Sequence, residues 1–103
     1  MTKSEKIKLI ESVIQHPSNE EGYYELARRL GGLKNDYNDY MTTAPINCDI
    51  ELKRLSNADF ELCVAFLTML LREDYFSNGA FCKRYKAGQV DAILNRMIAT
   101  LQA

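Results

Sequence analysis

The sequence predicts an all-α protein: a compact bundle of about five or six helices around a central apolar helix over residues 57–75. Three observations predict it. Apolar residues recur at helical spacing over residues 3–16, an almost uninterrupted apolar run fills residues 60–71, and an apolar stripe closes the chain over residues 89–101. The chain has 103 residues, 47% of them apolar, which suffices for one hydrophobic core but not for two. We therefore expect a single helical domain over residues 1–103.

The first helix is expected over residues 3–16, where apolar side chains recur every three or four residues between charged ones. Thr2 and Glu5 form a capping-box pair at its start. Pro17 ends the helix because proline disfavours helical dihedral angles at the residue before it.

A second helix is expected directly after this proline. Ser18 and Glu21 repeat the capping-box pattern at its start, and Gly31 and Gly32 stop it. Two short helices with a tight connection predict a helical hairpin.

An irregular or extended segment is expected near residues 44–54. Apolar and polar residues alternate from Ile46 to Leu52, which is the period of a half-buried strand, but such a strand would have no partner in this chain. Three alternatives stay open: an extended segment laid over the helices, a helix, or a strand paired with a second copy of the molecule. A helix is an alternative because Ile46 and Ile50 also share a helical face. We favour the helix or the extended cover.

The central helix is the strongest prediction. Ser56 and Asp59 form a capping pair before an apolar run that continues almost without polar interruption to Leu71. A helix that is apolar on most of its circumference belongs at the centre of a domain or in a subunit interface. Beyond it, Gly79 and Gly88 bracket a short helix, and the terminal helix follows.

Charge and cysteine content bound the class of protein. The chain has 13 basic and 14 acidic side chains, so it lacks the general basic excess of many nucleic-acid-binding domains. No apolar run approaches the roughly 20 residues of a membrane span, and the first residues do not resemble an export signal. The three cysteines, Cys48, Cys63 and Cys82, are widely spaced and odd in number, which is typical of a reducing compartment. We expect a cytoplasmic protein with no membrane partner.

We expect no metal site, no cofactor and no enzymatic activity. The cysteines and the single histidine, His16, lack the closely spaced ligand pairs of structural zinc sites. The chain contains no nucleophile elbow and no glycine-rich phosphate loop. His16 lies at an expected helix C-terminus, where an imidazolium is favoured without any catalytic role.

Two motifs lie near the C-terminus. Residues 67–79 have the spacing L-T-x3-R-x3-F-x2-G, and residues 88–97 have the spacing G-x-(I/V)-x2-(I/L)-L-x-R-(L/M). Together they resemble the C-terminal signature of a bacterial family known only as a domain of unknown function. The resemblance implies a compact prokaryotic or phage domain, and it implies no catalytic residues.

The first motif has a structural interpretation. The Thr68 hydroxyl is placed to bond the carbonyl of Val64, and Gly79 supplies a backbone angle that a side chain would resist. Arg72 is expected to cap the last carbonyls of its helix or to pair with a carboxylate on another helix, such as Asp59, Glu61 or Asp91. The alternative is an anion-binding pocket formed by Arg72, Asn78 and Gly79.

A short basic and aromatic element lies between the two motifs. Lys83, Arg84 and Lys86 alternate with Tyr85, and residues 79–103 hold four basic side chains and one acidic one. Such an element is able to contact phosphates through its cations, with Tyr85 stacked on a base. We favour a solvated helix face with inward aromatics, and keep nucleic-acid binding as the alternative function.

Four tyrosines suggest a different function. Tyr23, Tyr24, Tyr37 and Tyr40 lie in an acidic first half, in which residues 1–51 hold six basic and nine acidic side chains. Exposed tyrosines among acidic groups are typical of protein interfaces. Together with the central apolar helix, they favour a non-enzymatic protein-interaction or regulatory module, an adaptor or inhibitor, whose partner is another protein or itself in a homodimer.

Overall fold

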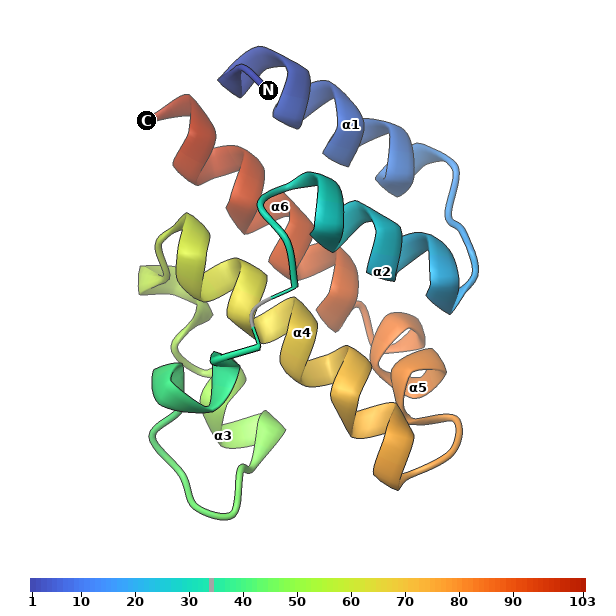
Figure 1. Cartoon of the computed structure of the whole chain (residues 1–103), viewed down its shortest axis with the longest axis vertical. Helices are drawn as coiled ribbons and strands as arrows, with labels where there is room; N and C mark the ends of the chain where they lie inside the picture. The colour runs from blue at the N-terminus through green and yellow to red at the C-terminus, as the bar shows by residue number, and fades with distance from the viewer. Residues whose placement is uncertain (34) are drawn as a thin grey trace.

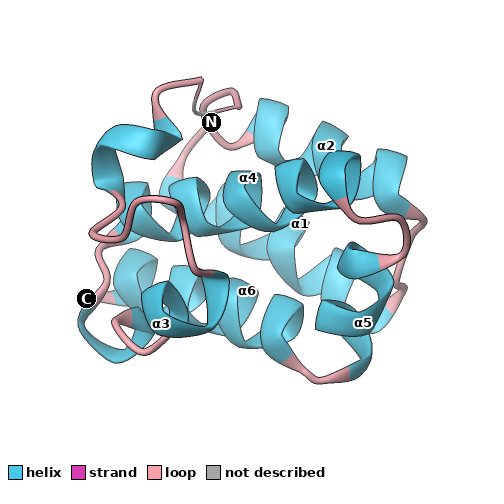
Figure 2. Cartoon of the chain, turned by 90° about the horizontal axis from the view of Figure 1, so that it is seen from below, coloured by secondary structure: helices cyan, strands magenta, loops and turns pink. Residues whose placement is uncertain are grey.

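The computed structural model describes residues 1–33 and 35–103, and every regular element in this part of the chain is helical (Figures 1 and 2). The predicted all-α class is confirmed. The described chain holds six α-helices and two 3₁₀ helices, in this order: α1 (Lys3–Gln15), α2 (Glu20–Arg29), η1 (Tyr37–Tyr40), α3 (Cys48–Leu52), η2 (Leu55–Asn57), α4 (Phe60–Phe76), α5 (Ala80–Lys86) and α6 (Gln89–Gln102).

The alternating segment forms the short helix α3, so the strand alternative is wrong. The side chain of Asn47 caps this helix by accepting a hydrogen bond from the backbone N–H of Ile50 at 3.0 Å. Cys48 and Glu51 are buried, while Ile50 is 46% exposed. The inward face therefore follows the helical period, because Cys48 and Glu51 are three residues apart, whereas the strand period would place Ile50 rather than Glu51 on the same face as Cys48.

The helices α1 to α4 each begin at a side-chain cap, and two of these starts differ from expectation by one to three residues. The capping box at Thr2 is confirmed, with its hydroxyl accepting from the third helical N–H at 3.1 Å. Asn19 rather than Ser18 caps α2. Asp59 caps α4, whereas its expected partner Ser56 lies in η2. In each case a short polar side chain accepts a hydrogen bond from one of the first backbone N–H groups of the helix, which have no partner within the helix.

Helix α4 lies at the centre of the fold. It contacts α2, α3, α5, α6 and η1, while α1 covers α6 from the other side. The four longer helices α1, α2, α4 and α6 run with their axes roughly aligned, and α5 closes one end of them (Figure 1).

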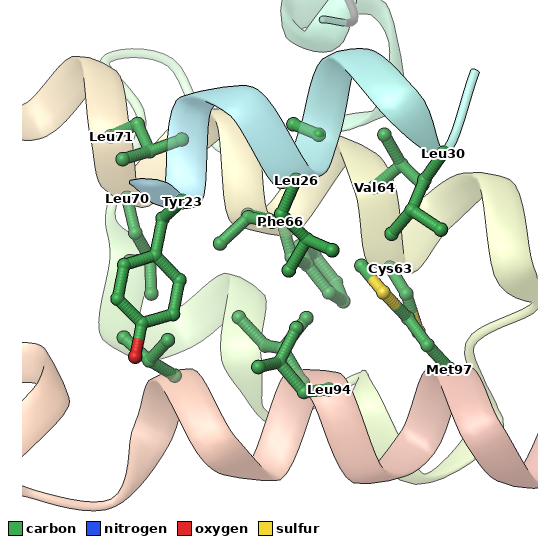
Figure 3. Close-up of a cluster of buried hydrophobic side chains, with 14 of the residues drawn as sticks. Tyr23, Leu26, Leu30, Cys63, Val64, Phe66, Leu70, Leu71, Leu94 and Met97 are labelled. Carbon is green, nitrogen blue, oxygen red and sulfur yellow. The ribbon is translucent and has the colours of Figure 1, made fainter. Parts of the chain in front are cut away.

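The hydrophobic core surrounds α4. All nine residues from 63 to 71 are buried. Figure 3 shows Phe66 between the side chains of α2, such as Leu26, and those of α6, such as Leu94 and Met97. Packing on every side explains why the sequence of this helix is apolar around its whole circumference. The chain itself buries residues 63–71, so the apolar run of α4 is no reason to expect a homodimer.

Two tight turns position the end of α4 and the helices after it. Gly79 and Gly88 precede α5 and α6 with φ of 85° and 83°, a left-handed conformation that side chains resist. The Thr68 hydroxyl donates to the carbonyl of Val64 at 2.9 Å, as expected.

No helix of the described chain has both the length and the apolar composition needed to cross a membrane.

Candidate functional site

A groove of about 640 Å³ opens between the C-terminal half of α4 and the segment that leads from η1 to α3. We call it the η1–α4 groove. One wall is a single face of α4 at helical spacing, and the other wall combines η1 with the loop before α3. Its lining residues are Tyr37, Asn38, Thr43, Ala44, Pro45, Ile46, Cys48, Met69, Arg72, Glu73, Phe76 and Ser77.

The two most exposed aromatic side chains of the described chain lie at the end of α4, and one of them, Phe76, lines the groove. Phe76 is 90% exposed and Tyr75 is 74% exposed. Both lie in the last turn of α4, beyond the segment 63–71 that the other helices bury. An exposed ring that adjoins an apolar groove, rather than standing alone on the surface, is typical of a binding surface.

A buried carboxylate holds the loop wall of the groove in place. Glu51 of α3 is fully buried, and it accepts hydrogen bonds from the backbone N–H groups of Thr42 at 3.0 Å and Thr43 at 2.8 Å. The hydroxyls of both threonines also donate to it. The guanidinium of Arg54 completes the network at 2.8 Å and donates as well to the carbonyl of Tyr40 at 2.9 Å. The loop and η1 are therefore fixed to α3.

This network keeps Glu51 ionised. Burial by itself raises the pKa of the carboxyl, but the hydrogen bonds from Thr43, Thr42 and Arg54 outweigh burial and hold the pKa at about 2. A buried charge is tolerated here because five donors replace the water that it has lost.

The two charged side chains in the groove differ in their partners. Glu73 is bonded to the guanidinium of Arg84 at 2.9 and 3.0 Å, and these bonds lower its pKa against the opposing effect of burial. Arg72 makes no ion pair with any described residue, and its guanidinium lies 5.8 Å from the ring centre of Tyr75. The groove thus contains one charge without a counterion. The ion pairs expected for Arg72 with Asp59, Glu61 or Asp91 are wrong.

The thiol in the groove is unreactive. Burial, with a further contribution from neighbouring Glu73, raises the pKa of Cys48 to about 12. The nucleophilic form of cysteine is the thiolate, so this thiol stays protonated at neutral pH. Among residues 1–33 and 35–103, no group of three or more His, Cys, Asp and Glu side chains is arranged to hold a metal ion.

The four tyrosines do not form one surface, which corrects the expected partner-binding set. Tyr23 is 1% exposed and packs against the rings of Phe81 and Tyr85. Tyr24 is half-buried, with its hydroxyl donating to a backbone carbonyl of α4 at 3.3 Å. The hydroxyl of Tyr40 donates to Glu61 at 3.4 Å. Of the four, only Tyr37 lines the groove.

Tyr23→Phe is expected to leave the free energy of unfolding unchanged or to raise it by up to about 1 kcal/mol. The buried hydroxyl of Tyr23 has no hydrogen-bond partner among the described residues, so its removal deletes an uncompensated polar group. Urea denaturation measures the effect, with Tyr24→Phe as the matched control, since that change removes a bonded hydroxyl and should be destabilising. A loss above about 1 kcal/mol for Tyr23→Phe would contradict the assignment.

The expected anion pocket is not assembled. Arg72 lines the η1–α4 groove, whereas Gly79 lines a different depression beside α2 and α5. Asn78 is exposed in the turn between α4 and α5 and lines neither. Gly79 serves the turn through its positive φ, which is the structural role that the motif predicts.

The basic and aromatic element is divided between the core and solvent. Arg84 bonds Glu73, Asp49 and Gln89, and so ties α5 to α4, α3 and α6. Tyr85 lies within 6.3 Å of the buried ring of Tyr23, between ring centres. Of the cations in this element, only Lys83 and Lys86 are exposed. Arg84 and Tyr85 are thus structural, which corrects their assignment to a phosphate-contacting and base-stacking surface.

Two residues that matter most to the groove were not assigned to a site from the sequence. In the sequence Phe76 is the phenylalanine of the first motif and follows the charged residues 72–74, and its exposure depends on where the neighbouring helices stop. Glu51 looks like a solvent-facing acid in an alternating segment. The one local signal for it is the pair Thr42 and Thr43, whose backbone and hydroxyl groups supply most of its donors.

The fold and the groove define a small all-helical domain with a rigid, solvent-open apolar site, and no group of metal-ligating side chains is assembled among its described residues. A family model matches residues 5–103, almost the whole chain. The chain belongs to this family, DUF6508, which is described as a family of unknown function. Comparison with curated proteins and with solved structures finds no significant match.

Proposed function

We propose that this chain is a non-enzymatic protein-interaction module of the bacterial cytoplasm, acting as an adaptor or inhibitor, and that the η1–α4 groove is its binding site. One observation carries the proposal: Phe76 is 90% exposed at the rim of an apolar groove. Burial of such a ring in a partner is worth about 1.5–3 kcal/mol, more than a typical surface contact.

The rigidity of the groove supports this role. The loop wall is held by the bonds of Glu51 and Arg54, and the opposite wall is the core helix α4. A partner that enters a preformed site loses less free energy to ordering the protein than one that must organise a mobile loop. Aromatic side chains at the centre of such a patch contribute most of the binding free energy in many interfaces.

The groove favours a protein ligand over nucleic acid. Its lining contains a single cation without a counterion, Arg72, and exposed cations near α5 are limited to Lys83 and Lys86. Binding to nucleic acid depends on several basic contacts to phosphate, each of which releases counterions. Because the groove has too few cations for this, the burial of apolar surface is the main source of affinity that it offers.

Phe76→Ser is expected to abolish capture of the partner when the protein is used as bait in a lysate of its native cells. Capture should survive nuclease treatment, because the contact is with protein. The matched control is Ile50→Ser, which removes another exposed apolar side chain that does not line the groove and should keep the partner.

Mass spectrometry of the retained proteins, with and without nuclease, gives the readout. If the captured proteins are lost on nuclease treatment, the result would contradict the proposal and would indicate that the chain binds nucleic acid. Equal losses for Phe76→Ser and Ile50→Ser would contradict the placement of the site in the groove.

A further inference from the structure

We infer, on the basis of this proposed function, that the occupant of the η1–α4 groove is a second copy of this chain, with Phe76 of each copy buried in the groove of the other. The dimer is two-fold symmetric. Its contact surface consists of the last turn of α4, the groove, and the η1 segment beside it.

Anchor and receptor lie on the same face of one molecule. Phe76 belongs to the groove lining and is still 90% exposed, so its ring does not fill its own groove. In a two-fold interface every contact occurs twice, which requires a surface that carries both halves of the contact. The adjacent Phe76 and apolar groove meet this requirement. A second copy therefore covers both the exposed Phe76 and the groove. A partner that only inserts an apolar side chain into the groove would leave Phe76 exposed to water.

The charges around the groove are also self-complementary. Arg72 on the α4 wall has no ion pair among the described residues, and neither do Asp36 and Asp39, which are exposed on the η1 side. In a two-fold pair, the α4 wall of one copy approaches the η1 side of the other, so Arg72 meets these carboxylates across the interface. Glu73 does not oppose this contact, because Arg84 of the same chain neutralises it.

Sedimentation velocity of the full chain over a wide concentration range tests the inference. We expect a monomer–dimer equilibrium for the wild-type protein. Phe76→Ser should weaken association at least about 30-fold, as expected for the loss of a central anchor. Ile50→Ser, the matched control outside the groove lining, should leave the equilibrium unchanged.

A charge exchange tests the geometry itself. Arg72→Glu should weaken self-association, and so should the double variant Asp36→Lys with Asp39→Lys, because each places like charges opposite one another. An equimolar mixture of the two variants restores opposite charges at both contacts of a mixed dimer. Association should then return to near the wild-type level. These positions are exposed or half-exposed without ion pairs, so circular dichroism should show unchanged folding.

A wild-type protein that stays monomeric up to about 300 μM would overturn the inference. A specific dimer with a dissociation constant in the micromolar range would be populated at that concentration. A dimer that is insensitive to Phe76→Ser would also overturn it, because another face would then be used. The proposed function and the dimer can be tested independently of each other. A monomeric wild-type protein that still captures a Phe76-dependent partner from lysate would contradict the dimer and leave the interaction role standing.

Discussion

Glu51→Gln is expected to lower the free energy of unfolding by about 3 kcal/mol at neutral pH. The substitution keeps the size of the side chain and removes its charge. It also places an amide N–H₂ group among donors, where the backbone of Thr43 and the guanidinium of Arg54 require acceptors. Because Glu51 is fully buried, water cannot replace the lost bonds.

The effect of Glu51 should depend on pH in a defined direction. Its folded pKa of about 2 lies below the ordinary value of 4.5, so its contribution to stability is fully present above pH 4.5. The contribution falls as the pH drops from 4.5 toward 2, where the folded carboxylate begins to take up a proton. The difference between wild type and Glu51→Gln should therefore shrink across this interval.

Urea denaturation at pH 7 and at steps down to pH 2 measures both effects. Glu11→Gln is the matched control, because Glu11 is exposed on α1, and its removal should change stability by less than about 0.5 kcal/mol. A difference between wild type and Glu51→Gln that stays constant down to pH 2 would contradict the role of the ionised carboxylate. So would a loss below about 1 kcal/mol at pH 7.

Arg84→Met is the second large effect, with an expected loss of about 2 kcal/mol. Arg84 is 17% exposed and its partner Glu73 is 24% exposed, so the pair is largely removed from water. The substitution leaves Glu73 partly buried without a counterion and releases the contacts of α5 with Asp49 and Gln89. Methionine retains most of the apolar stem, which confines the change to the charged head.

Lys83→Met is the control for Arg84→Met. It removes the same charge from the neighbouring position, but Lys83 is exposed, and stability should change by less than about 0.5 kcal/mol. Adding Glu73→Met to Arg84→Met should recover part of the loss, because the buried carboxylate is then absent as well. Thermal and urea denaturation provide the comparison. Equal effects of Arg84→Met and Lys83→Met would contradict the structural role of Arg84.

The helices were predictable because their signals are local. The apolar stripe of α6, the capping box at Thr2 and the glycines at positions 79 and 88 act on residues within one or two helical turns. Where two neighbouring polar residues compete for the same cap, as Ser18 and Asn19 do, the pattern defines the helix but not its first residue.

The groove was not predictable in the same way, because it depends on which residues are left uncovered. Phe66 and Phe76 belong to the same helix, yet Phe66 is buried between α2 and α6 while Phe76 is 90% exposed. Exposure of this kind is decided by the lengths and crossing of neighbouring helices. Likewise, Tyr23 and Tyr24 are adjacent in sequence, but one enters the core and the other lies at its edge.

The sequence by itself determined that this chain forms an all-helical bundle around one apolar helix, because helical periodicity, capping and glycine turns are properties of neighbouring residues. Tertiary structure alone decided which charges are satisfied and which surfaces stay open. It assigned Arg84 to an ion-pair network, Glu51 to a buried loop anchor, and Phe76 to solvent beside a groove. Those outcomes depend on contacts between residues far apart in the chain, such as Asp49 with Arg84, and no local pattern records them.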